Sequence, residues 1–235
     1  MNSINPINPN DPTILLTIDV EDWFQVENFK PYIPFSSWPS CELRVEKNIH
    51  RLLDLFDSHH GQQATNNGRG RRPQATFFVL GWIAERLPQL IREIHARGHE
   101  IASHGTRHID LNLCNEAELW MEMTASKKVF ESHGINVDTF TCAFNTWSQD
   151  VLKYSERDYR TFRASTGINK HPPETRVYHA MDGTEAAQYA RDCLDDNVWI
   201  IGIWHDVHSP NFEAAISKVQ STRWNVKTVR EVYGY

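Results

Sequence analysis

Several features that define other protein classes are missing from this sequence. None of its segments reaches the roughly 18 consecutive apolar residues that a transmembrane helix needs. Lysine plus arginine number 24 against 30 aspartate plus glutamate, and this excess of negative charge argues against a surface that binds nucleic acid. The four cysteines include no C-x-x-C pair, which argues against a zinc ribbon or a thioredoxin-type redox site. The remaining composition, 40% apolar and 23% charged, is that of one soluble, folded domain.

The first 12 residues contain neither a cationic start nor an apolar stretch, so they do not resemble a secretory signal peptide. We therefore expect a flexible lead-in at residues 1–12, one domain at residues 13–235, reduced thiols and a cytoplasmic location.

Short apolar runs alternate with helical patterns along the rest of the chain. The expected strands are 13–18, 75–80, 99–102, 139–144, 159–164, 197–203 and 224–229. The expected helices are 42–56, 82–97, 115–132, 149–156, 185–194 and 212–220. The intervening loops are 23–42, 59–72 and 165–184. This alternation predicts a parallel sheet with helices outside it. No G-x-G-x-x-G follows the first strand, which argues against a dinucleotide-binding sheet.

Acidic residues and histidines follow three of the expected strands. They are Asp19, Glu21 and Asp22 after the first strand, His104 and His108 after the third, and His205, Asp206 and His208 after the sixth. Each cluster alone is at least as well explained by ordinary surface or core residues. The carboxyl ends of parallel strands meet at one face, however, so we expect the three clusters to form one site.

A carboxylate and two histidines can hold one divalent ion and leave coordination positions open. Such an ion lowers the pKa of a bound water to roughly 7 and polarises a carbonyl group. A second carboxylate could accept the proton of the water, and a separate histidine could protonate the leaving group. The clusters therefore predict a metal-dependent hydrolase.

Five segments resemble motifs of the polysaccharide deacetylase family, carbohydrate esterase family 4, whose domain is also called the NodB homology domain. They read D-V-E-D-W-F at 19–24, A-T-F-F-V-L-G at 75–81, G-H-E-I-A-S-H-G-T-R-H at 98–108, Y-R-T-F-R-A-S at 159–165 and I-W-H-D at 203–206. The first of these is similar to a variant found in one branch of the family. The resemblance covers nearly all of residues 13–230 and implies an α/β fold, a distorted (β/α)7 TIM-like barrel.

The resemblance also implies a role for each site residue. Asp19 would be the general base, and His104 and His108 would be metal ligands. His205 would be the general acid, with Asp206 or another carboxylate orienting it.

The third metal ligand is ambiguous, because its usual position in the family motif is Val20, which cannot ligate. Strand alternation places Asp19 and Glu21 on the same side, whereas Asp22 lies beyond the strand, where the chain can turn. We favour Asp22 and keep Glu21 as the alternative. The expected cofactor is one divalent ion, zinc first, with cobalt, nickel, manganese or iron as alternatives.

The third motif of the family, R-x-P-Y or a Y-P-x-G form, should fall at residues 141–145, which contain neither Arg nor Pro. In the family this arginine tunes the catalytic aspartate, and the motif lines the substrate groove. Arg163 could supply the missing charge, or it could be a structural residue.

The resemblance implies that the enzyme removes an N-acetyl group from an amino-sugar-containing saccharide or its precursor. One alternative is hydrolysis of another amide, such as a cyclic imide or ureide. A second is a catalytically weakened barrel that binds a glycan or a partner. The aromatic residues at 23–38 would either stack on sugars or pack over the barrel mouth. We expect no nucleic-acid partner and no membrane span, and the oligomeric state is left open.

Overall fold

The computed structural model of the chain describes residues 13–58, 73–165, 169–170, 177–182, 198–204, 214 and 225–233. The expected lead-in at 1–12, the loop at 59–72, the helix at 185–194 and all but one residue of the helix at 212–220 lie outside the described residues.

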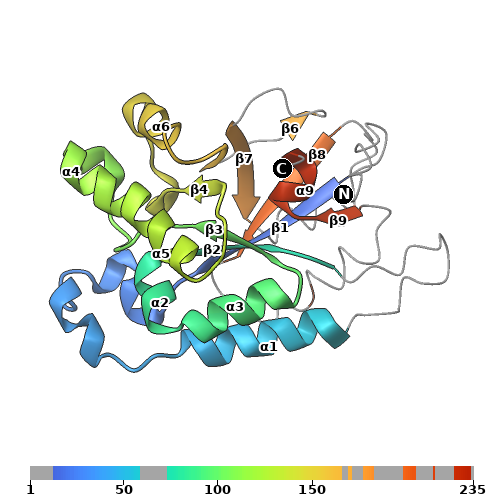
Figure 1. The fold of residues 1–235 in the computed structure, drawn as a ribbon, viewed down its shortest axis with the longest axis horizontal. Coiled ribbons are helices and arrows are strands. Elements are labelled where there is room, and N and C mark those ends of the chain that lie inside the picture. Colours follow the sequence, from blue (N-terminus) through green and yellow to red (C-terminus); the bar gives the residue numbers. More distant parts are fainter. Residues whose placement is uncertain are drawn as a thin grey trace.

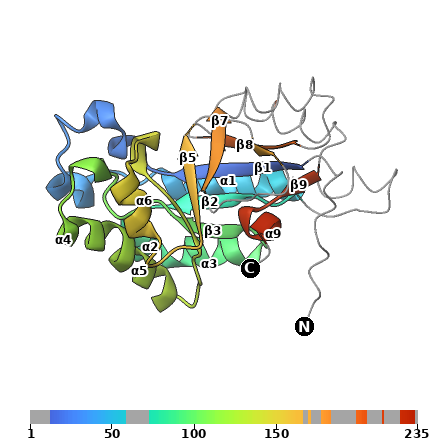
Figure 2. The same cartoon turned by 90° about the horizontal axis from the view of Figure 1, so that it is seen from above.

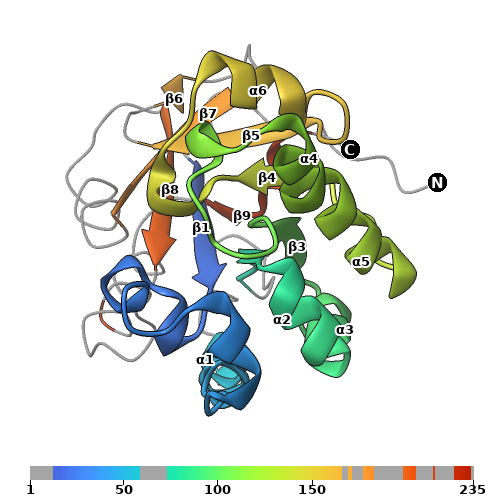
Figure 3. The ribbon, with the colours of Figure 1, turned by 90° about the vertical axis from the view of Figure 1, so that its left-hand side faces the viewer.

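Seven parallel strands form a ring at the centre of the described part of the chain (Figure 3). They are β1 (Thr13–Val20), β2 (Thr76–Val79), β3 (Glu100–Ser103), β4 (Thr139–Thr141), β5 (Thr161–Ser165), β7 (Val177–Asp182) and β8 (Val198–Trp204). Each strand pairs with the next, and β8 pairs back with β1, so the ring is closed. The barrel is irregular, because β3 and β4 share a single register pair, Ser103 with Phe140. The predicted distorted (β/α)7 barrel is confirmed.

Two further strands extend the sheet. β6 (Asn169–Lys170) runs antiparallel to β8, and β9 (Asn225–Lys227) pairs with the first three residues of β1. β1 thus contacts β9 near its start and β2 from Thr17 onward, and every one of its residues is buried. A strand buried on both faces explains the unbroken apolar run at its start.

The described helices lie around these strands (Figures 1 and 2). They are α1 (Val45–Ser58), α2 (Gly81–Arg86), α3 (Pro88–Ala96), α4 (Glu116–Leu119), α5 (Ser126–Ser132), α6 (Gln149–Ser155) and α9 (Val229–Tyr233). α1 shows the expected pattern, because its buried residues Val45, Ile49, Leu52, Leu53 and Phe56 recur at helical spacing. No helix in the described ranges is long and apolar enough to cross a membrane.

The two long helices expected at 82–97 and 115–132 are interrupted. The first breaks at Leu87, whose φ of −123° and ψ of 54° are not helical, because the following Pro88 disfavours the helical conformation before it. The second contains a π-helical turn, Trp120–Ala125, between α4 and α5.

Several strands also differ from the sequence-based expectation. The first strand continues to Val20, so that Asp19 belongs to it, and the fourth ends at Thr141. The stretch expected to be irregular at 165–184 contains β7. Its residues V-Y-H-A-M-D have too little apolar character to show a strand, which instead depends on pairing with β5 and β8.

The long aromatic segment after β1 is folded into three short 3-10 helices, Trp23–Gln25, Glu27–Phe29 and Phe35–Ser40. Phe24 and Trp38 are buried and pack edge-to-face with Trp82 of α2. Packing therefore explains these two aromatics, whereas Phe29, Tyr32 and Phe35 remain exposed.

Candidate metal centre

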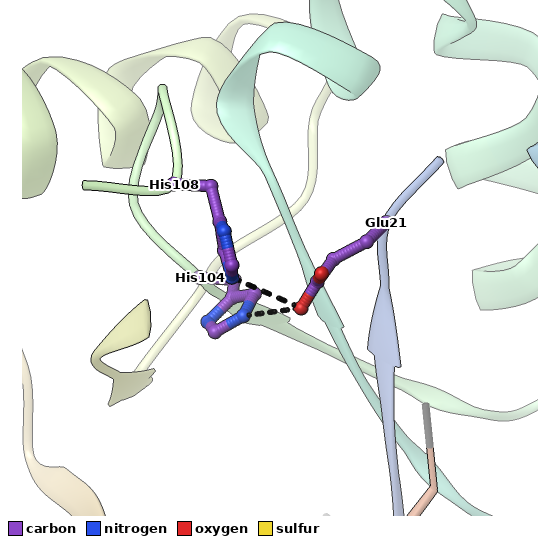
Figure 4. Close-up of side chains that lie close together, drawn as sticks. All are labelled: Glu21, His104 and His108. Carbon is purple, nitrogen blue, oxygen red and sulfur yellow. Dashed lines mark hydrogen bonds and ion pairs between the residues drawn. The ribbon is translucent and has the colours of Figure 1, made fainter. Parts of the chain in front are cut away.

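Glu21, His104 and His108 converge at the carboxyl ends of β1 and β3 (Figure 4). Oε1 of Glu21 lies 3.1 Å from Nε2 of His104 and 3.1 Å from Nε2 of His108. The three potential ligand atoms all lie within 4.8 Å of one another. Both histidines are buried, and the Glu21 side chain is nearly so.

The surroundings of these groups suit a divalent cation. Burial alone would raise the pKa of Glu21, but hydrogen bonds and charge from His104 and His108 outweigh it and hold that pKa well below its usual range. Nδ1 of His104 lies 3.3 Å from the carbonyl oxygen of Thr141, and donation to that carbonyl would leave the Nε2 lone pair free to ligate. Nδ1 of His108 is buried without a hydrogen bond to the described residues. Two imidazole nitrogens and a carboxylate oxygen are donors that zinc accepts.

The carboxylate of Asp22, the favoured third ligand, is engaged by backbone groups rather than by the histidines. The Asp22 carboxylate caps the first 3-10 helix by accepting from the backbone N–H of Trp23 at 2.9 Å. Its other oxygen accepts from the backbone N–H groups of Arg44 at 2.8 Å and Val45 at 3.1 Å. Asp22 therefore anchors the segment between β1 and α1, and Glu21 is the carboxylate that the structure brings to the histidines.

Asp19 lies beside this cluster and forms a buried ion pair with Arg163 of β5. Both guanidinium Nη atoms donate to the carboxylate at 2.6 Å, and the two side chains are 1% and 0% exposed. Oδ2 of Asp19 also lies 3.9 Å from Nε2 of His104. A bidentate pair of this kind fixes the orientation of the carboxylate.

The other contacts of Arg163 hold its guanidinium in place. It donates to the hydroxyls of Thr17 at 3.1 Å and Thr141 at 3.2 Å, and it stacks 4.3 Å from the ring centre of Phe78. Arg163 thus brings to Asp19 the positive charge that residues 141–145 lack.

The segment after β4, where the resemblance places the third family motif, also reaches the cluster. The ring of Phe144 packs against the His108 ring at a centroid distance of 4.5 Å. Lys30 of the aromatic segment also lies over the Phe144 ring, with its Nζ 5.4 Å from the ring centre. His108, Phe144 and Asn145 all have positive φ, between 52° and 58°. Such backbone strain gathers at functional sites, and the sequence motifs had marked His108 but neither Phe144 nor Asn145.

His205 and Asp206 lie outside the described residues. β8 ends at Trp204, directly before them, and Trp204 is in register with Ile18 of β1. Their predicted roles as general acid and orienting carboxylate stay predictions.

Comparison with known proteins agrees with this architecture. Residues 69–162 match the family model of polysaccharide deacetylases. A chitooligosaccharide deacetylase from Sinorhizobium fredii is 35% identical over 126 residues, which are 53% of this chain and 51% of the relative. The chain spans about half of the length of the curated relatives that it matches.

Two solved structures share the fold over 98% of this chain. A polysaccharide deacetylase-like structure from Mycobacterium smegmatis superimposes with a TM-score of 0.69 at 14% identity and is covered over 91% of its length. A Bacillus anthracis pseudoenzyme of the CE4 family, in a mutant with restored activity, gives a TM-score of 0.64 at 13% identity and is covered over 71%. Residues 69–162 therefore match a polysaccharide deacetylase domain, and the chain has relatives and structural neighbours in that family.

Proposed function

We propose that this chain is a metal-dependent deacetylase that removes an N-acetyl group from an amino-sugar-containing saccharide or its precursor. The convergence of Glu21, His104 and His108 beside the Asp19–Arg163 pair carries the proposal. The relatives add the substrate class, because the Sinorhizobium protein is named a chitooligosaccharide deacetylase.

In this proposal Glu21, His104 and His108 hold one divalent ion, zinc first. When bound, such an ion supplies Lewis acidity, which polarises an amide carbonyl and makes a water molecule more acidic. Of the two carboxylates that the sequence left open, Glu21 is the proposed ligand, because both Asp22 oxygens already accept backbone hydrogen bonds.

Asp19 is the proposed general base. Its Oδ2 lies 3.9 Å from Nε2 of His104, so a proton accepted there would come from the immediate neighbourhood of the ligands. Arg163 holds the carboxylate by two hydrogen bonds and thereby restricts the direction from which it accepts. Protonation of the departing amine is assigned to His205, with Asp206 as its orienting partner.

Metal content tests the ligand set directly. We expect the wild-type protein to hold about one equivalent of zinc after incubation and dialysis, measured by mass spectrometry. Glu21→Gln and His104→Ala should lose it, because each removes a ligand. Asp22→Asn should keep the metal while lowering thermal stability, since its loss affects the segment between β1 and α1. If Asp22→Asn loses the metal while Glu21→Gln keeps it, the third ligand is Asp22 and not Glu21. If the wild-type protein binds no metal, the proposed function is overturned.

Substrate assays separate this activity from its alternative. Release of acetate from N-acetylglucosamine oligomers by the zinc-loaded protein supports the deacetylase. Ring opening of small cyclic imides without acetate release would instead assign the altered segment at 141–145 to a different amide hydrolysis. Binding of the oligomers with neither reaction would indicate a glycan-binding barrel.

A further inference from the structure

The loop between the two histidines needs support from outside itself. After β3 and His104 the chain reverses at Gly105, whose φ is +77°, and reaches His108 with a φ of +53°. A non-glycine residue in this left-handed conformation costs free energy and persists only where neighbouring contacts fix it. The position of His108 therefore depends on what holds residues 105–107.

Glu122 provides this support. Its Oε2 accepts from the backbone N–H groups of Thr106 at 2.7 Å and Arg107 at 2.9 Å. Its Oε1 accepts from Nε of Arg107 at 2.6 Å, so the carboxylate is also paired with a cation. The Glu122 side chain is 1% exposed, which makes these contacts strong and costly to break. A methyl group added at Gly105 would stand 3.1 Å from the same Oε2, so the loop lies directly against the carboxylate.

The π-helical turn Trp120–Ala125 contains Glu122 and is itself braced by hydroxyl groups. A π turn widens the helix by one residue and leaves carbonyls without their usual partners. Here the hydroxyl of Ser126 donates to the carbonyls of Glu122 at 2.6 Å and Met123 at 2.8 Å. The hydroxyl of Tyr159 donates to the carbonyl of Met123 at 2.8 Å. The irregular helix thus holds Glu122 in a fixed position beneath the loop.

We infer that Glu122 is a positioning residue of the metal centre, which sets the His104–His108 geometry by clamping the backbone of Thr106 and Arg107. The inference rests on the proposed function, since it assumes that the two histidines bind a divalent ion. Glu122 does not contact the ligands themselves and acts only through the loop.

The test compares Glu122→Gln with Glu118→Gln in the full chain. Glu118 lies one turn before Glu122 and allows the same substitution, and among the described residues its carboxylate accepts only from the backbone N–H of Asn115. Cobalt binding is measured by competition with a chelator, together with the visible spectrum of the bound ion. We expect Glu122→Gln to bind cobalt about 10–100-fold more weakly with an altered spectrum, as for other residues that orient ligands, and Glu118→Gln to match the wild type.

Amide hydrogen exchange in the metal-free proteins gives an independent measurement. The amides of Thr106 and Arg107 should exchange faster in Glu122→Gln than in the wild type, because the acceptor that protects them is weakened. If Glu122→Gln does not fold, Glu122→Asp replaces it, since its shorter side chain keeps the charge but withdraws the carboxylate from the N–H groups of Thr106 and Arg107.

The outcomes are distinguishable. A wild-type protein that binds cobalt, beside a Glu122→Gln variant with unchanged affinity, spectrum and exchange, overturns the role of Glu122 alone. A wild-type protein that binds no cobalt overturns the proposed function and this role with it.

Discussion

At the scale of single residues, the buried Asp19–Arg163 ion pair can be tested directly by substitution. Two charges removed from water compensate each other here through a bidentate contact, so removing one leaves the other buried and unpaired. The sequence left Arg163 open between a supporting and a structural role. Its contacts with Asp19, Thr17 and Thr141 show a buried structural network around the carboxylate, and the catalytic consequence belongs to the proposal.

Replacing Arg163 by Met should lower the free energy of unfolding by about 3–5 kcal/mol. Urea unfolding in the presence of a chelator measures this without a contribution from bound metal. Arg160→Met is the matched control, because Arg160 is 65% exposed and its loss should change stability by less than about 0.5 kcal/mol. In the double variant Asp19→Asn, Arg163→Met the loss should be smaller than the sum of the single losses. Equal stability of Arg163→Met and the wild type would contradict this account.

At the scale of elements, the segment between β1 and α1 behaves as a small folded unit. Asp22 fixes its two ends, since it accepts from Trp23 at the start and from Arg44 and Val45 at the end. Trp38 fills its interior, with its ring 5.6 Å from Phe24 and 5.4 Å from Trp82. The sequence showed the aromatic content but not which rings were packed, because that depends on the face that α2 presents.

Trp38→Ala should cost about 3–5 kcal/mol of unfolding free energy, since it leaves a cavity in this aromatic cluster. Tyr32→Ala in the same segment removes a ring that is 80% exposed and should leave stability nearly unchanged. Thermal unfolding of the two variants beside the wild type is the measurement. If both variants melt alike, Trp38 does not hold the segment in the way that its contacts indicate.

At the scale of the whole molecule, Glu100 joins several elements at the amino ends of the strands, opposite the metal centre. Its carboxylate accepts from the hydroxyls of Thr76 at 2.8 Å and Thr139 at 3.2 Å and from the backbone N–H of Arg230 at 2.8 Å. β2, β3, β4 and α9 are thereby joined at one point. Burial raises the pKa of Glu100 despite these hydrogen bonds.

This raised pKa predicts a pH dependence of stability. Above the ordinary glutamate pKa of 4.5 the folded chain keeps a proton that the unfolded chain has lost, so stability falls as pH rises through the folded pKa. One such proton contributes at most about 1.4 kcal/mol per pH unit. The difference in unfolding free energy between the wild type and Glu100→Gln should therefore decrease from pH 4.5 upward, as measured by urea unfolding. If the unfolding free energies of the two proteins change with pH in parallel, the raised pKa of Glu100 is contradicted.

The sequence by itself determined a parallel sheet with helices outside it, because apolar periodicity is a local property. The resemblance of its short motifs added the barrel class and named the residues expected at the carboxyl ends of the strands. Tertiary structure alone decided that Glu21 and not Asp22 meets the histidines, since the choice depends on where α1 presents its free N–H groups. It also decided that Arg163 pairs with Asp19 across 144 residues and that β7 is a strand. Those outcomes arise from contacts between elements far apart in the chain, which no local pattern records.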